Sequence, residues 1–197
     1  MKKLEPFEQV IKFVTQNTDI PASIDLTIRW GDPLSFWTGI VLDCGEIRVN
    51  PRLADFGNFI HDLGHIATCP SELRQFATGK LGADFRREID RFDRQNGNTS
   101  NKRFGADDDI DDDAATYWGM LLSIELGLST GAVFNQGFGE DAHRLYQSCM
   151  DAYDHHAPSV FSTALYCRGL LKSPTAREPI AWDLSRIKHR VHLSLMN

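Results

Sequence analysis

The stretch Ala54-Asp-Phe-Gly-Asn-Phe-Ile-His61-Asp62-Leu-Gly-His65-Ile-Ala-Thr68 carries the most informative pattern in the chain. Its apolar residues recur at helical spacing, which predicts an α-helix over about residues 54–68. Residues four positions apart lie on one face of a helix, so the imidazoles of His61 and His65 can bind one ion. The stretch therefore predicts a metal-binding helix with a carboxylate, Asp62, beside its first ligand.

Two buried, hydrogen-bonded histidines on a core helix would be the purely structural interpretation of this pair. Three features favour a metal site instead: the acid at position 62, the close backbone approach that Gly64 permits, and an apolar surround. The surrounding apolar residues are Phe59, Ile60, Leu63 and Ile66.

Two histidines hold a divalent metal weakly, so a third protein ligand is expected elsewhere in the chain. Six aspartates occupy the seven positions 107–113, at the start of a helix predicted over 109–127. Counting 100° per residue places Asp111 and Asp113 beside the apolar face of that helix, whereas Asp112 points away from it. We therefore expect Asp111 or Asp113 to be the third ligand. Helix capping is the alternative role for these acids, because carboxylates stabilise the positive end of a helix.

The remaining patterns predict an α+β fold that is mainly helical, with a small N-terminal antiparallel sheet. Alternation predicts a strand over 24–28, and the segments 37–42 and 46–50 flank a turn at Asp43-Cys44-Gly45, which indicates a hairpin. Further helices are expected over residues 4–17, 71–78, 82–95, 139–154, 159–171 and 180–194. We expect a single domain over 1–197, with the metal-site core at about 36–127 and a helical extension over 128–197.

Composition excludes several classes of protein. The 197 residues carry a net charge of −6, which argues against a broad nucleic-acid-binding surface. No window approaches the ~18 apolar residues of a membrane span, so no membrane association is expected. The four cysteines form no C-x-x-C pair, which favours a reducing compartment and a cytoplasmic location.

The strand at Glu46–Asn50, the helix with His61-Asp-Leu-Gly-His65 and the helix that opens with Asp111-Asp-Asp-Ala114 together resemble the zincin metallopeptidases of the gluzincin type. Those enzymes place an edge strand before a His-Glu-x-x-His helix and take a third ligand from a downstream helix. The resemblance covers about residues 36–127, and within this clan the small ImmA/IrrE-like bacterial proteins are the most similar in size and layout.

The resemblance implies that His61, His65 and Asp111 hold one divalent ion, zinc in the first place, and that Asp62 occupies the general-base position. It also implies a zincin-like fold and a peptide or protein substrate. The family has glutamate where this chain has Asp62, whose carboxylate is drawn back by roughly 1.5 Å, the length of one methylene. General-base catalysis needs a reach of about 2.6–3.2 Å to the attacking water, so this substitution bears directly on peptidase activity.

Three other functions remain open from the sequence. Two histidines and one carboxylate are also the ligand set of non-haem iron oxygenases, which makes iron the alternative metal. The motif His61-Asp62 resembles that of HD-type phosphohydrolases, although these need another histidine upstream and the chain has none before His61. A zincin-like domain without a working base would be a catalytically inactive binding or sensor protein.

Overall fold

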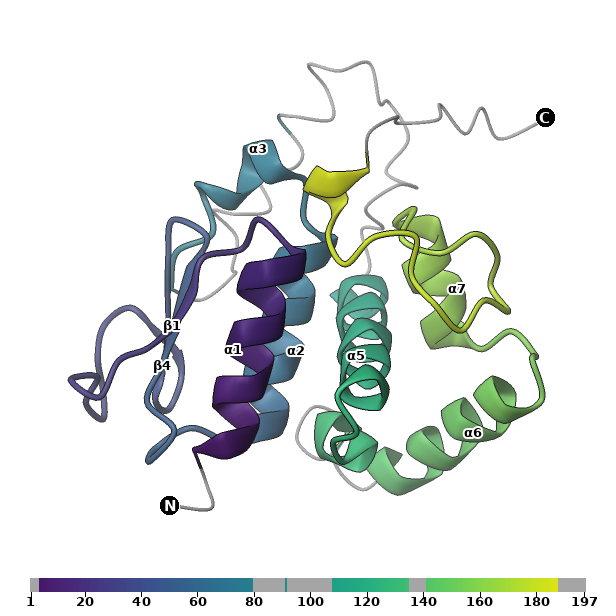
Figure 1. Ribbon diagram of the computed structural model, residues 1–197, viewed down its shortest axis with the longest axis horizontal. Coiled ribbons are helices and arrows are strands. Elements are labelled where there is room, and N and C mark those ends of the chain that lie inside the picture. The colour runs from purple at the N-terminus through teal and green to yellow at the C-terminus, as the bar shows by residue number, and fades with distance from the viewer. Residues whose placement is uncertain (1–3, 80–90, 92–107, 135–140, 188–197) are drawn as a thin grey trace.

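The structure is a computed structural model that describes residues 4–79, 91, 108–134 and 141–187 (Figure 1). A small sheet lies at one side, helices α1 and α2 lie beside it, α5 stands in the middle, and α6 and α7 form the other side. This arrangement confirms a mainly helical α+β fold. In chain order the elements are α1 (Glu5–Asn17), β1 (Ala22–Ile24), β2 (Ser35–Trp37), β3 (Ile40–Asp43), β4 (Glu46–Val49), α2 (Phe56–Thr68), α3 (Ser71–Arg74), α5 (Asp108–Glu125), α6 (Ala142–Asp154), α7 (Val160–Cys167) and the 3-10 helices η1 (Thr130–Phe134) and η3 (Leu184–Arg186).

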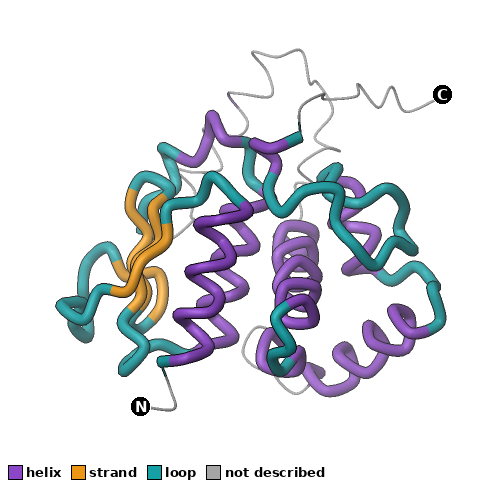
Figure 2. Tube along the Cα trace, viewed as in Figure 1, coloured by secondary structure: helices purple, strands orange, loops and turns teal. Residues whose placement is uncertain are grey.

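The strands, orange in Figure 2, lie together in one sheet. Its order is β1-β4-β3-β2 and it is mixed, so the expectation of an antiparallel sheet is wrong for the pair of β1 and β4. Strand β1 runs parallel to β4, with Ala22 opposite Ile47. The chain leaves β1 at one edge, crosses to β2 at the other edge, and only then forms the antiparallel series β2-β3-β4. Strands β2 and β4 run in the same direction, because each is antiparallel to β3. Strand β1 also runs in this direction, so it pairs with β4 in parallel.

The strand predicted over 24–28 is wrong for residues 25–28: only Ile24 is in a strand, as the last residue of β1. The side chain of Asp25 accepts a hydrogen bond from the Thr27 N–H at 2.9 Å, and this local turn competes with extension of the strand. The same aspartate pairs with Arg48 of β4 at 2.9 Å. Asp25, which the alternating pattern placed inside a strand, therefore lies in the turn that ends β1.

The predicted hairpin is confirmed. Strands β3 and β4 are antiparallel, with Asp43 opposite Glu46. The two residues between them, Cys44 and Gly45, have φ angles of 50° and 80°, as a two-residue hairpin turn of the primed type requires. A Cβ on Gly45 would lie 2.8 Å from the Arg74 carbonyl oxygen, so this glycine also lets the turn pack against α3.

Helices α2 and α5 approach each other closely along a line of small residues. A Cβ on Gly64 would lie 2.5 Å from the carbonyl oxygen of Ala115, and a Cβ on Gly119 would lie 2.7 Å from the Ile60 side chain. The partner number on α5 falls by four as the number on α2 rises by four, so the two helices are antiparallel. This seam fixes which residues of α5 lie beside each turn of α2.

Other helices agree with the sequence to different extents. The expected helices over 4–17, 54–68, 109–127, 139–154 and 159–171 correspond to α1, α2, α5, α6 and a shorter α7. The helix expected over 71–78 is only the short α3, and the one expected over 82–95 lies outside the described residues apart from position 91.

The helix expected over 180–194 is wrong in its described part, residues 180–187, which contains only η3. The Asp183 side chain accepts from the backbone N–H groups of Ser185 and Arg186, which caps this short helix. It also accepts from the backbone N–H of Asp19 at 2.6 Å. A periodic pattern could not reveal this bond to a residue 164 positions away.

One cluster of buried side chains joins the N-terminal elements to the C-terminal ones, from Phe7 of α1 to Leu171 after α7. Trp118 of α5 is fully buried in it and donates to the Trp182 carbonyl at 2.9 Å. The predicted extension over 128–197 thus shares its core, in its described part, with the segment 36–127. Among the described helices, none has both the length and the apolar character of a membrane span.

The α2–α5 seam predicts the effect of Gly64→Ala. The added methyl would overlap the Ala115 backbone, and such overpacking lowers the free energy of unfolding by about 2 kcal/mol. Chemical denaturation of both proteins measures this difference.

Gly131→Ala is the matched control, because the nearest atom to its new Cβ would be a Tyr146 ring carbon at 4.0 Å. We expect this variant to stay within about 0.5 kcal/mol of the wild type. Equal effects of the two substitutions would contradict close packing at Gly64.

Candidate metal centre

Helix α2 presents His61 and His65 on one face, as the sequence predicts. The helix begins where the Asp55 side chain accepts from the Asn58 N–H at 3.1 Å, which is an N-cap. The two imidazole rings lie edge to face, with centroids 4.6 Å apart and planes at 88°. Their nitrogen atoms are therefore close enough to face a shared ion.

The seam between α2 and α5 brings a carboxylate to this pair. Ala115 lies against Gly64, and Asp112 lies one turn earlier on α5, beside the histidines. The distance from His65 Nε2 to Asp112 Oδ1 is 3.1 Å. One ligand atom from each of His61, His65 and Asp112 lies within 4.8 Å of the other two.

This geometry fits one divalent ion. In a tetrahedral zinc site with bonds of about 2.0–2.1 Å, neighbouring ligand atoms are about 3.4 Å apart. The 3.1 Å separation of His65 Nε2 and Asp112 Oδ1 is close to that value, and the ligand atom of His61 lies within 4.8 Å of both residues. Two imidazoles and a carboxylate also suit zinc or iron chemically, and three protein ligands leave a position for water or substrate.

The surroundings keep His61 in its metal-binding form. Burial, followed by the neighbouring His65, lowers the pKa of His61 to about 3, and the Asp112 charge and a hydrogen bond with the Asp112 backbone oppose this only in part. A histidine must be neutral to bind a metal ion, so His61 is ready to bind at neutral pH.

The carboxylate in this group comes from Asp112, which the helical wheel predicted to point away from the apolar face of its helix. Asp113 is half-buried and is not in the group; its charge acts on the thiol of Cys149. The side chain of Asp111 lies outside the described part of the chain, so its predicted role as a ligand stays a prediction.

Among the described residues, Asp112 supplies the carboxylate from the solvent side of the α2–α5 seam. Its side chain keeps 53% of its surface exposed while it contacts His65. The signal that could have identified it is the spacing of small residues. Pairing Gly64 with Ala115 in antiparallel helices places the residues one turn before Ala115, Asp111 and Asp112, near His65.

Asp62, the predicted general base, lies on α2 and is only 2% exposed. It follows His61 by one residue and is therefore turned about 100° around the helix from it. Asp62 is not in the group formed by the described histidines and Asp112. Its role as a base stays a prediction.

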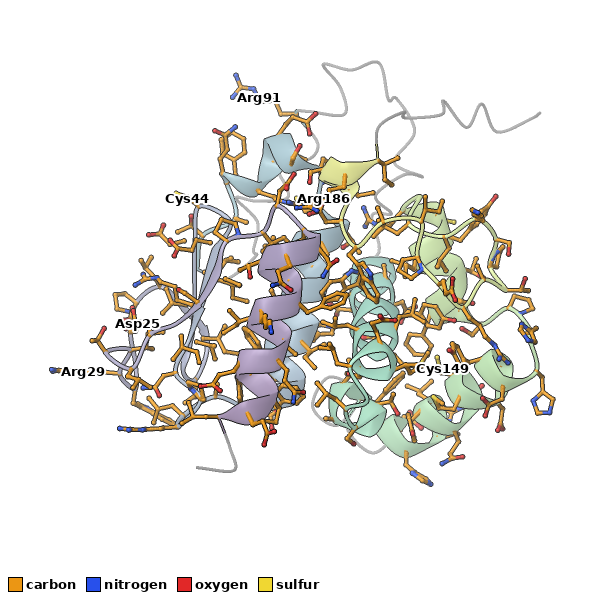
Figure 3. The ribbon with its side chains drawn as sticks, in the orientation of Figure 1. Asp25, Arg29, Cys44, Arg91, Cys149 and Arg186 are labelled. Atoms are coloured by element: carbon orange, nitrogen blue, oxygen red, sulfur yellow. The ribbon has the colours of Figure 1, made fainter. Side chains whose placement is uncertain are left out.

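Cys69, which follows His65 by four residues, is a buried thiol outside the metal group of the described residues. Burial raises the pKa of Cys69 to about 12. Burial, and to a lesser extent the charge of Asp113, also raises the pKa of Cys149 to about 12. Figure 3 shows Cys149 in the interior between α5 and α6, whereas Cys44 lies at the outer end of the sheet.

Comparison of the chain with protein-family models, with curated proteins and with solved structures gives no match. The arrangement of His61, His65 and Asp112 is therefore the basis on which a function can be assigned.

Replacement of Asp112 tests the ligand group. Substitution of residues that merely support a metal ligand lowers affinity by 10–100-fold, so Asp112→Asn should lower zinc affinity by more than about 100-fold. Competition with a chromophoric chelator measures the dissociation constant. Asp113→Asn should change it by less than about threefold, and an equal loss in both variants would show that Asp112 is not the particular ligand.

The cysteines allow an independent test of the burial pattern. The thiolate is the reactive form, and a pKa near 12 leaves almost none of it at pH 8 for Cys69 and Cys149. We expect Cys44 and Cys167, which are exposed, to react with a thiol reagent in the folded protein. The other two should react only after unfolding, as mass spectrometry of the labelled peptides would show. Rapid labelling of Cys149 in the native protein would contradict the packing of α5 against α6.

Proposed function

We propose that the protein is a metal-dependent hydrolase in which His61, His65 and Asp112 hold one divalent ion, with zinc as the first candidate. The observation that carries this proposal is that one ligand atom from each of these three residues, on two different helices, lies within 4.8 Å of the other two. The neutral state of His61 and the open side of Asp112 support it further. Zinc is preferred because two imidazoles and a carboxylate with an open fourth position are typical of catalytic zinc.

A bound divalent ion would supply an activated water and would polarise the bond to be cleaved. The residues of the chain have separate tasks around it. His61 and His65 bind from the rigid side, where the apolar core fixes α2. Asp112 binds from the solvent side, so substrate would approach past its exposed edge.

We propose a peptide or protein as the substrate and Asp62 as the general base. The support is the sequence His61-Asp-Leu-Gly-His65, which resembles the zincin signature with the acid at the base position. In this role Asp62 would accept a proton from the attacking water and return it to the leaving amine.

A second candidate is a metal-binding protein that does not hydrolyse its partner. The burial of Asp62, at 2% exposure, favours it, because a base must reach the water that it activates. The phosphohydrolase alternative gains no support, since it would need Asp62 as a ligand and the group found among the described residues contains Asp112 instead. An iron oxygenase would use the same three ligands, so the identity of the metal separates it from a hydrolase.

Metal analysis of the full chain, purified without added metal, tests the proposal first. We expect about one equivalent of zinc, since three ligands from two packed helices form the site before the metal binds. Less than a tenth of an equivalent of any transition metal, with no uptake of added zinc or iron, would show that no such centre exists. Iron in place of zinc would favour the oxygenase, which oxygen consumption with candidate substrates would then test.

Asp62→Asn tests catalysis separately from metal binding. A general base contributes about 10²–10⁴-fold to a rate, so hydrolysis of a peptide library should fall by that factor while zinc content stays unchanged. Asp55→Asn is the matched control, because asparagine caps a helix as well as aspartate does. Binding of zinc without any turnover in the wild type would favour the second candidate.

A further inference from the structure

The last turn of α2, which carries His65, lacks the hydrogen bonds that an uninterrupted helix would provide. The carbonyl of Ile66 would accept from the residue four positions on, but that residue is Pro70, which has no N–H. The N–H of Cys69 would donate to the carbonyl of His65 in a continuing α-helix, and it donates to Ile66 O instead, at 3.3 Å. His65, a predicted metal ligand, therefore lies in a turn whose backbone hydrogen bonds are incomplete.

Two side chains add hydrogen bonds to the carbonyls of this turn. The hydroxyl of Thr68 donates to the carbonyl of Gly64 at 2.9 Å, with a longer contact of 3.3 Å to that of His65. The guanidinium of Arg74 reaches back from α3, and its Nε donates to the carbonyl of Ile66 at 3.0 Å. A positive charge at a helix C-terminus also stabilises the dipole of that helix.

Arg74 is itself fixed in place. It is 6% exposed, and its Nη1 lies 3.7 Å from Oδ2 of Asp183, a carboxylate with no exposed surface. Asp183 in turn accepts from the N–H of Asp19 at 2.6 Å and from that of Ser185 at 2.7 Å. Figure 1 shows η3, which follows Asp183, lying next to α3 and above the end of α2. The C-terminal part of the described chain thus reaches the turn that carries His65.

We infer that Arg74 is a positioning residue for the metal centre: by binding the Ile66 carbonyl it fixes the last turn of α2 and so the direction in which His65 points. The inference rests on the proposed function, because it concerns the same metal site. Arg74 does not belong to the ligand group, and it acts through the backbone of the residue next to His65. Lysine at position 74 would keep the charge but could not place one planar group on both Ile66 and Asp183.

The chain contains a matched control for this inference. Arg177 binds the end of α6 in the same way, with Nε donating to the Tyr153 carbonyl at 2.8 Å and Nη2 to the Asp154 carbonyl at 2.6 Å. Its guanidinium also lies over the Tyr153 ring, 4.7 Å from the centroid. No residue of α6 belongs to the His61, His65 and Asp112 group. A purely structural role should therefore affect Arg74 and Arg177 variants alike.

The experiment compares Arg74→Lys and Arg177→Lys in the full chain. Zinc dissociation constants come from chelator competition, and the absorption spectrum of the cobalt-substituted protein reports the ligand geometry. We expect Arg74→Lys to weaken zinc binding by at least about tenfold, as for other residues that orient a ligand, and to change the cobalt spectrum. Arg177→Lys should lower the melting temperature but keep the dissociation constant within about twofold and leave the spectrum unchanged.

The outcomes separate the inference from the proposed function. If the wild type binds neither zinc nor cobalt, the proposal of a metal centre is wrong. If the wild type binds zinc but Arg74→Lys keeps its affinity and its cobalt spectrum, or if both lysine variants lose affinity equally, the positioning role is wrong. Should Arg74→Lys fail to fold, Asp183→Asn provides the same test, because it removes the carboxylate that orients the Arg74 guanidinium. A folded Asp183→Asn protein with wild-type affinity and spectrum would overturn the inference.

Discussion

The close contact of Gly64 with Ala115 is the constraint on which the rest of the structure depends. A side chain at position 64 would overlap the Ala115 backbone, so only glycine lets α2 and α5 meet at this distance. Because the helices are antiparallel, this single contact also sets the register between them. The register places Asp112 beside His65, and the candidate metal centre is therefore a direct result of helix packing.

The electrostatic character of the centre follows from where this contact lies. The α2 side of the site belongs to the core, and burial there keeps His61 neutral. The α5 side opens to solvent, where the Asp112 side chain keeps 53% of its surface exposed. The proposed metal-dependent hydrolase would use the apolar side to fix its ion and the open side to admit a substrate. Asp62 lies on the buried side, which is why hydrolysis and metal binding need separate tests.

The same helix is also completed by residues far away in the sequence. Pro70 removes a donor from the end of α2, and Arg74 replaces it while Asp183 holds Arg74. This network explains two features of the chain together: the short α3, from which Arg74 reaches back, and the absence of a regular helix in residues 180–187, where Asp183 has to meet Asp19 and Arg74. The helix propensity of residues 180–187 is overridden here, because the buried carboxylate of Asp183 requires hydrogen-bond partners.

The sequence by itself determined the features that depend on residues near one another. The periodicity around His61 and His65 predicted α2 and its shared histidine face, and the turn at Cys44 and Gly45 predicted the β3–β4 hairpin, because helix and turn geometry are local. Tertiary structure alone decided the parallel pairing of β1 and β4 and, among the described side chains, the approach of Asp112 to the two histidines. The physical reason is that a helical wheel gives the direction of a side chain on its own helix, whereas a ligand is defined by the register between two helices, and Gly64 and Ala115 fix that register only when they pack.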